Sequence, residues 1–441
     1  MLEDNLRTLF TLEAEADQPP SRVSVPAAGR SARMRQRQRR ALNIGSPVLA
    51  AAAVIAVIAT SVALSGVAFS GGGGRIAHPA RTGMPLAVPG SAGWTRVPGA
   101  PIAPRSEYAG VWTGKEMIVW GGYGKTTQSG AGAAYDPATR TWTKLAPGPL
   151  AGRDLPVTVW TGKDMLIFGG SGTSGAYSDG AAYDPATSTW RKLAPIPASL
   201  GGNLTGSGSY AVWTGKAMVA WGFFGHGDGA HGGGSLAAAT YNPAANSWTA
   251  GTVAPAQAPL FGDAFWTGKE MIVWGSSPVP PGQLEGLAYD PATRKWSTLP
   301  AAPLGRAGRE SMLAVWTGKY LVVGGGDSPT GLQKDAAAYD PATNSWTRLP
   351  HAPVGFEGNG TAPDIWTGAS LITIEDAVPG GRPLSLDLTT KRWSLGPKAP
   401  VPGRQEAHEL WTGSAVLVWG GGVPVGSSCC KAVQTGYSYT P

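Results

Sequence analysis

The string Trp-Thr-Gly occurs seven times in this chain, and this repetition restricts the fold more than any other feature of the sequence. Successive copies are 45 to 53 residues apart. Their tryptophans are Trp112, Trp160, Trp213, Trp266, Trp316, Trp366 and Trp411. A period of this length indicates an array in which each unit buries its apolar surface against the next. The sequence therefore predicts one repeat architecture over most of the 441 residues.

A second signature, Tyr-Asp-Pro-Ala-Thr-x-x-Trp or a close variant, follows each of the first six copies. Its tryptophans are Trp142, Trp190, Trp248, Trp296, Trp346 and Trp393. The abundance of Gly and Pro, 65 and 38 residues, indicates many turns and hence many short strands. Each unit is thus predicted to contain four strands, with an all-β fold as the result.

The first unit illustrates the expected strands and turns. Residues 117–120 are apolar at successive positions, which predicts a strand buried on both faces. Thr-Gly-Lys after Trp112 is expected to form a tight turn in which glycine adopts a positive φ. Asp136 and Pro137 open a second turn, because proline fixes φ and aspartate caps the turn. Trp142 then lies on the fourth, outermost strand.

The two ends of the repeat region supply complementary fragments of one unit. The unit after Trp411 ends at Pro441, before its fourth strand. Residues 94–98 match the fourth strand at 346–350 but have no preceding strands. We therefore expect a seven-bladed β-propeller over 94–441, closed by the N-terminal strand at 94–98. Ring closure leaves only short, protected sheet edges.

The repeats resemble those of kelch proteins, in which a double glycine follows strand two and a Tyr and a Trp follow later. The matching pairs are Gly121-Gly122, Gly169-Gly170, Gly324-Gly325 and Gly420-Gly421. The sixth unit departs from the pattern, with Ile374-Glu375 in place of the glycines and Leu386 in place of Tyr. The resemblance implies a bacterial variant of the kelch repeat on a scaffold like that of galactose oxidase, with blade six the most irregular.

A hydrophobic segment precedes the repeats. Residues 48–69 carry no charge and are long enough to span a bilayer. Six arginines lie at positions 30–40, so the positive-inside rule places the N-terminus in the cytoplasm. We expect a basic cytoplasmic tail at 1–40, a single transmembrane helix at 41–70, a flexible linker at 71–93 and an extracellular propeller. The alternative is a cleaved signal peptide and a secreted protein.

The charge distribution does not favour nucleic acid as a partner. Eight arginines against five acids in the first 40 residues account for much of the net charge of +7. The repeat region has no basic stripe, so we expect no nucleic-acid binding there. We expect a monomeric propeller whose partner is a protein or a glycan outside the cell.

Loop lengths indicate where a ligand would bind. The turn after each Trp-Thr-Gly and the turn before each fourth strand are uniform, whereas the loops between strands two and three and those between blades vary. Both variable kinds open on the same face of the ring, and loops on a rigid scaffold carry binding. The ligand-binding candidates on this face are arginines at the start of four blades, each with an acid close behind: Arg105, Arg153, Arg309, Arg404, Glu107, Asp154, Glu310 and Glu406. The arginines could recognise an anionic or sugar ligand; the alternative is structural ion pairs around the rim.

Two further groups are candidates for chemistry. His226, Asp228 and His231 in the long loop of blade three could bind a metal, although a solvent-exposed glycine-rich loop explains them as well. The adjacent Cys429 and Cys430 allow a strained disulfide between neighbours, two free thiols or an intermolecular bond. Their adjacency argues against a structural zinc site.

The function expected from these features is recognition or scaffolding outside the cell. No catalytic residues are predicted, and no cofactor is predicted. Copper-dependent sugar oxidases share the scaffold, but they require a lone crosslinked Cys, which this chain lacks. An enzyme acting on a carbohydrate or cell-envelope substrate, such as a sugar oxidase or a hydrolase, is the alternative, because fold does not determine function.

Overall fold

The computed structural model describes residues 93–441 except for short gaps. The gaps are at 174, 205–208, 226–233, 260, 279–280, 306–308, 310, 359–363, 375–380, 401–403, 405–406 and 426–427. The chain divides into two units, and the blades belong to the unit formed by Val48–Pro424 and Cys430–Pro441. No helix in the described part of the chain is long and apolar enough to cross a membrane. The predicted membrane segment at 48–69 lies outside the described residues.

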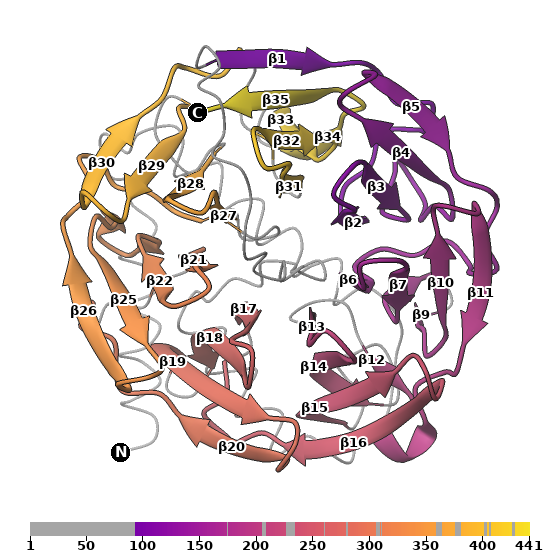
Figure 1. Ribbon diagram of the computed structural model, residues 1–441, viewed down its shortest axis with the longest axis horizontal. Coiled ribbons are helices and arrows are strands. Elements are labelled where there is room, and N and C mark those ends of the chain that lie inside the picture. Colours follow the sequence, from indigo (N-terminus) through magenta and orange to yellow (C-terminus); the bar gives the residue numbers. More distant parts are fainter. Residues whose placement is uncertain are drawn as a thin grey trace, which may run out of the picture. The chain divides into compact units, whose positions relative to one another are not determined.

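Seven antiparallel sheets stand around a common centre, as Figure 1 shows. In each sheet the strand that ends at the Trp-Thr-Gly tryptophan is innermost, and the strand that carries the second tryptophan is outermost. The predicted seven-bladed all-β propeller is thereby confirmed. We number the blades by their Trp-Thr-Gly motifs, from Trp112 in blade one to Trp411 in blade seven.

The first three blades follow one another along the chain. Blade one contains β2 (Ala109–Trp112), β3 (Met117–Trp120), β4 (Gly132–Asp136) and β5 (Thr141–Lys144). Blade two contains β6 (Val157–Trp160), β7 (Met165–Phe168), β10 (Gly180–Asp184) and β11 (Thr189–Leu193). Blade three contains β13 (Tyr210–Trp213), β14 (Met218–Gly225), β15 (Gly234–Asn242) and β16 (Ser247–Val253).

The next three blades repeat the same order. Blade four contains β17 (Phe261–Trp266), β18 (Met271–Pro278), β19 (Pro281–Asp290) and β20 (Lys295–Thr298). Blade five contains β21 (Leu313–Trp316), β22 (Leu321–Gly324), β25 (Ala336–Asp340) and β26 (Ser345–Leu349). Blade six contains β27 (Ile365–Trp366), β28 (Ser370–Thr373), β29 (Leu384–Asp387) and β30 (Arg392–Leu395). The innermost strand of blade six, β27, has only two residues.

Blade seven joins the two ends of the ring. It contains β31 (His408–Trp411), β32 (Val416–Trp419) and β35 (Gly436–Thr440), and its outer strand is β1 (Gly93–Val97). β1 pairs with β35 antiparallel, with Trp94 opposite Tyr439 and Val97 opposite Gly436. The strand expected over residues 94–98 is therefore β1, and it supplies the fourth strand that the C-terminal unit lacks.

Short additional elements lie in the connections. They are β8 (Ser171–Gly172), β9 (Gly175–Ala176), a 3₁₀ helix (Ala198–Leu200), β12 (Asn203–Leu204), β23 (Asp327–Ser328), β24 (Gly331–Leu332), β33 (Gly422–Val425) and β34 (Ser428–Ala432). β8–β9, β23–β24 and β33–β34 are two-stranded hairpins, whereas β12 pairs with β14. These additions differ from blade to blade.

The core lies between blades. All four residues of β3 are buried, which confirms the prediction that strand two has both faces covered. The fourth-strand tryptophans of blades one to six each pack on an aromatic residue, with ring centroids 4.9–5.9 Å apart. This residue comes from strand two of the preceding blade, except in blade six, where it comes from the segment leading into the blade. The pairs are Trp120–Trp190, Phe168–Trp248, Trp221–Trp296, Trp274–Trp346, Phe356–Trp393 and Trp419–Trp142. These contacts combine apolar burial with favoured aromatic geometry.

Each fourth-strand tryptophan also ties its blade to the preceding one. Its indole Nε1 donates a hydrogen bond of 2.7–3.2 Å to a main-chain carbonyl near or just after the end of the fourth strand of that blade. All seven do so: Trp94 to Pro397, Trp142 to Pro98, Trp190 to Ala146, Trp248 to Ala194, Trp296 to Thr252, Trp346 to Pro300 and Trp393 to Pro350. The bond from Trp94 crosses the seam that closes the ring.

One face of the ring, which we call the turn face, carries the uniform turns. In every Trp-Thr-Gly turn the threonine Oγ1 accepts a hydrogen bond of 2.8–3.0 Å from the amide three residues later. Asp136 caps the other turn of blade one by accepting from the amide of Ala138 at 2.8 Å. Lys115 joins the two turns, with its Nζ 3.5 Å from Asp136 Oδ2. The turns predicted from Thr-Gly-Lys and Asp-Pro are confirmed.

Candidate functional site on the loop face

The opposite face, which we call the loop face, carries the loops between strands two and three and the segments between blades. These two kinds of loop are hydrogen-bonded to each other. Ser106, which precedes strand one of blade one, exchanges main-chain bonds of 3.0 and 2.8 Å with Tyr123 in the loop after strand two. Asp154 and Ser171 make the same exchange in blade two, at 2.9 Å each. The expectation that both variable loops share one face is confirmed.

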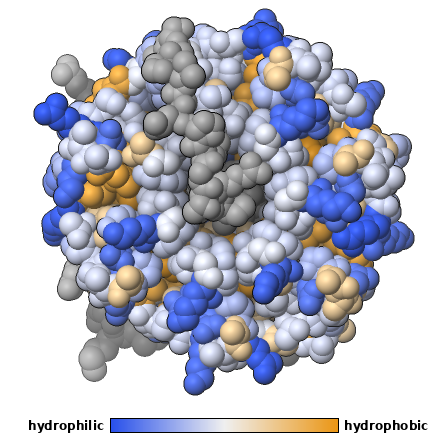
Figure 2. All heavy atoms as spheres, in the orientation of Figure 1, coloured by the Kyte–Doolittle hydropathy of each residue, from blue (hydrophilic) through white to orange (hydrophobic). Residues whose placement is uncertain are grey.

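The space-filling view in Figure 2 shows one face of the ring. Apolar residues on this face form separate patches divided by hydrophilic side chains. A contiguous apolar area is what usually marks a hydrophobic docking site. The face drawn has a mixed surface instead, so polar and charged groups are the ones to consider for recognition.

The four arginines at the blade starts are buried. Arg105, Arg153, Arg309 and Arg404 have exposed fractions of 2%, 0%, 2% and 4%. A buried guanidinium must satisfy its N–H groups within the protein. Most of the acceptors are main-chain carbonyls.

Each arginine binds the first glycine of the double-glycine motif in its own blade. Nη1 donates to the carbonyl sixteen residues later, at 2.9–3.2 Å. The acceptors are Gly121, Gly169, Gly325 and Gly420. In blade five the pair used is thus Gly325-Gly326 rather than the Gly324-Gly325 aligned from the sequence.

The second glycine of each pair reaches into the following blade. Its amide donates to a carbonyl of the segment leading into that blade: Gly122 to Arg153, Gly170 to Leu204, Gly326 to Phe356 and Gly421 to Arg105, at 2.7–3.3 Å. Gly122 has φ +93, and a Cβ there would lie 2.6 Å from the carbonyl oxygen of Ser106. Arginine and double glycine therefore form one structural unit, which we call the arginine–glycine latch.

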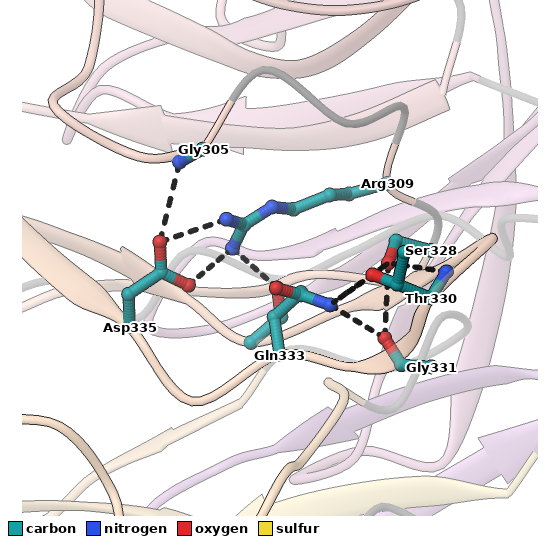
Figure 3. A network of polar contacts seen from close by, with 8 residues as sticks. Gly305, Arg309, Ser328, Thr330, Gly331, Gln333 and Asp335 are labelled. Carbon is teal, nitrogen blue, oxygen red and sulfur yellow. Dashed lines mark hydrogen bonds and ion pairs between the residues drawn. The ribbon is translucent and has the colours of Figure 1, made fainter.

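The four latches differ in what faces the rest of the guanidinium. Arg309 forms a bidentate pair with Asp335, Nη1 to Oδ1 at 2.5 Å and Nη2 to Oδ2 at 2.7 Å (Figure 3). Arg153 pairs with Asp179 through Nη1 at 2.7 Å. Arg404 Nη2 donates to Thr435 Oγ1 at 2.7 Å.

Arg105 has a different set of partners. Its Nε donates to Ala103 O at 2.9 Å, and its Nη1 donates to Ala131 O at 2.8 Å as well as to Gly121 O. Among the salt bridges of the described residues, Arg153 and Arg309 have a carboxylate partner and Arg105 has none. Burial lowers the pKa of Arg105 to about 10, with Tyr108 acting weakly in the other direction. The side chain is still charged at neutral pH.

Of the acids predicted beside the arginines, Asp154 and Glu107 lie in the described part of the chain. Asp154 is buried and accepts a hydrogen bond from Gln128 Nε2 at 2.9 Å, and burial raises its pKa despite that bond. Glu107 adopts φ 56, and its carbonyl accepts from the amide of Leu155 at 2.9 Å. Glu310 and Glu406 lie outside the described residues. Among the described residues, Asp179 pairs with Arg153 and Asp335 pairs with Arg309, and each acid lies twenty-six residues after its arginine.

A second group of buried polar residues, which the sequence did not single out, lies on and beside the innermost strands. They are Asp263, Asp364, His408 and Glu409. Asp364 Oδ2 accepts from the amide of Ala314 in the preceding blade at 2.9 Å, and the His408 amide donates to Tyr108 Oη at 3.0 Å. These two bonds join neighbouring blades near the centre of the ring.

The other candidates lie where the structure gives no side-chain description. His226, Asp228 and His231 are outside the described residues, and the side chains of Cys429 and Cys430 are too. Within residues 93–441 outside the gaps, no group of three or more His, Cys, Asp or Glu could hold a metal ion. Metal binding by the blade-three loop stays a prediction.

Comparison with known proteins gives the fold only. No protein-family model matches the chain, and no curated protein matches it. Among solved structures it is similar to a fungal alcohol oxidase of the AA5 family in complex with copper, with 13% identity and a TM-score of 0.59 over 80% of this chain and 77% of that one.

Proposed function

We propose that this chain is a membrane-anchored recognition protein with kelch-type repeats, which binds a protein or glycan outside the cell on its loop face. The contrast between the two faces carries this proposal. Seven identical threonine-capped turns form the turn face. Hairpins β8–β9, β23–β24 and β33–β34 and the strand β12 add structure to the loop face in blades two, five, seven and three, respectively. A fixed scaffold with one variable face is the usual arrangement of binding proteins.

The experiment is a binding screen of the full-length protein against a glycan array and purified peptidoglycan, followed by two matched triple variants. Lys125, Lys334 and Lys431 are exposed on the loop face, and Lys115, Lys163 and Lys269 are exposed on the turn face. Changing either set to glutamate alters the net charge equally. The buried arginines are unsuitable for this purpose, because their replacement would disturb folding.

We expect the loop-face variant to weaken binding and the turn-face variant to bind like the parent. The opposite result would show that the turn face is the functional one. Absence of binding to every glycan and to peptidoglycan would remove the glycan half of the proposal and leave a protein partner, to be sought by crosslinking at the loop-face lysines.

The structural similarity to a copper-containing alcohol oxidase suggests a second candidate, an enzyme acting on a carbohydrate or cell-envelope substrate. Elemental analysis of the purified protein, together with measurement of oxygen consumption on sugar alcohols, tests it. Stoichiometric copper with substrate-dependent oxygen uptake would favour the enzyme over the recognition protein.

A further inference from the structure

The position just before strand three can be compared among the four latches. In each, the amide of the first latch glycine donates to the carbonyl at this position: Gly121 to Ala131, Gly169 to Asp179, Gly325 to Asp335 and Gly420 to Thr435, at 3.0–3.2 Å. The same bond in all four blades makes these residues structurally equivalent. The side chain at this position differs among the four blades, and so does the use of its carbonyl, which accepts from the arginine Nη1 in blade one, at Ala131, whereas in blade five Arg309 bonds to the Asp335 side chain.

Blade five shows the arrangement with a carboxylate present. Both oxygens of Asp335 face the Arg309 guanidinium, and Asp335 Oδ2 also accepts from the amide of Gly305 at 3.3 Å (Figure 3). The Arg309 side chain is 1% exposed and that of Asp335 is 16% exposed. The carboxylate thus sits on the solvent side of the buried cation.

Blade one has the same cation with a methyl group in place of the carboxylate. Within the described part of the chain, Arg105 donates its hydrogen bonds through Nε and Nη1. Its Nη2, the atom that holds Asp335 in blade five, is left for another acceptor. Ala131 is exposed, so the space occupied by the aspartate side chain in blade five is reached from solvent in blade one. A buried cation without an anionic partner is costly, and an anion that supplies one gains a strong charge-assisted bond.

We infer that Arg105 forms a binding site for the carboxylate group of an external ligand, which takes the place that the Asp335 side chain occupies in blade five. The inference rests on the proposed function in assigning the ligand to the loop face, and it adds the chemical class of the group bound. The other three latch arginines already have an acid or a hydroxyl from their own blade. Arg105 also accepts the Gly421 amide through its carbonyl, at 3.0 Å, so the bound carboxylate sits beside the seam that closes the ring.

The test uses acetate as the probe and the full-length protein. Thermal unfolding is followed while acetate replaces chloride at constant ionic strength. A ligand that binds only the folded state raises the midpoint in a saturable manner. We expect this rise in the parent, and phosphate in a parallel titration reports whether a tetrahedral anion is accepted as well.

Three variants decide the assignment. Ala131→Asp supplies the carboxylate internally, so its midpoint without acetate should rise and its affinity for acetate should fall at least about tenfold. Ala131→Asn has nearly the same shape without the charge and should retain more of the acetate response than Ala131→Asp. Asp335→Ala creates the same vacancy in blade five, and in the Ala131→Asp background it should restore an acetate response.

An acetate response that is absent in the parent, or unchanged in Ala131→Asp, would overturn the inference. If Ala131→Asp does not fold, Asp335→Ala alone must show an enlarged response for the inference to stand. The acetate experiment needs no natural ligand, so its failure is separate from a failure of the binding screen on the loop-face and turn-face variants.

Discussion

Trp94 on β1 is the residue with which the closure of the ring can be measured. Its ring stacks on Tyr439 of the last strand, with centroids 4.9 Å apart, and its Nε1 donates to Pro397 O of blade six at 3.1 Å. Trp94→Ala removes both contacts, whereas Trp94→Phe keeps the stacking and removes the hydrogen bond. The two variants therefore separate the contributions of packing and hydrogen bonding at the seam.

The expected magnitudes follow from the partial burial of Trp94. Burying a large apolar side chain fully stabilises by about 1.5–3 kcal/mol, and Trp94 is only partly buried, so we expect roughly half of that. The aromatic pair adds about 0.5–1.5 kcal/mol and the hydrogen bond about 0.5–1.5 kcal/mol. Trp94→Ala should therefore lower the free energy of unfolding by about 2–4 kcal/mol, and Trp94→Phe by about 1 kcal/mol.

The assay is urea unfolding followed by far-ultraviolet circular dichroism. Trp142→Ala is the control. Trp142 makes the equivalent hydrogen bond, to Pro98 O at 2.8 Å, but its strand β5 follows the other strands of blade one directly in the chain. We expect Trp142→Ala to destabilise at least as much as Trp94→Ala, because Trp142 also packs on Trp419 of blade seven. A Trp94→Ala protein with the unfolding curve of the parent would refute the closure of blade seven by β1.

Three other perturbations test separate parts of the structure. Burial alone would raise the pKa of Asp335, but the bonds from Arg309 and the Gly305 amide hold it below its ordinary value of 3.8. The stability that this pair gives the parent is thus present above pH 3.8 and lost as the pH falls through the lowered pKa. Asp335→Asn should lower the free energy of unfolding by about 2–3 kcal/mol at neutral pH. It should also flatten the dependence of the free energy of unfolding on pH in the acid range. Gly122→Ala should lower the thermal unfolding midpoint more than Gly114→Ala. Both glycines have a positive φ, but only at Gly122 would a Cβ collide with main-chain atoms. Equal effects of the two changes would contradict the structural role assigned to Gly122 in the latch. A C-terminally tagged protein should fractionate with membranes through residues 48–69, whereas a soluble mature form beginning near Gly71 would establish a cleaved signal.

The repetition of the sequence was sufficient to predict the blades. Tryptophan spacing set the number of units, Asp136 and Pro137 set a turn, and the incomplete unit after Trp411 matched the orphan strand at residues 94–98. These features are local, or they repeat at a fixed period, so one chain contains several copies of each. Repetition within the sequence acts here as an internal alignment.

The partners of the buried arginines were harder to predict, because they are set by contacts between loops. The acids next to the arginines in the sequence, such as Glu107 and Asp154, were the predicted partners. Arg153 and Arg309 pair with acids twenty-six residues further along the chain. The sequence nevertheless contains a pattern that predicts the contact. Every blade that begins with the arginine has a double glycine starting sixteen residues later, and the blades that lack the arginine also lack the double glycine at that position. This association within one chain points to a shared contact.

Blade five shows a substitution that no periodic pattern could reveal. Gly324 is the fourth residue of strand two in blade five, where blades one, three, four and seven have a tryptophan. Phe356, from the segment leading into blade six, is fully buried there and packs on Trp393 instead. Because the replacement comes from a different strand position, only the three-dimensional structure shows it.

The arginine–glycine latches are distributed unevenly around the ring. In the described residues, latches cross from blade seven to one, one to two, two to three and five to six. Latches thus join blades seven, one, two and three into one arc, which contains both ends of the ring, and blades five and six into another, whereas blade four has none among its described residues. We expect amides of β17 to β20 to be the first core amides to exchange with solvent, because none of these latches ties them to a neighbouring blade. A ligand that bridged blade four to either arc would then tighten the whole propeller without a change of fold.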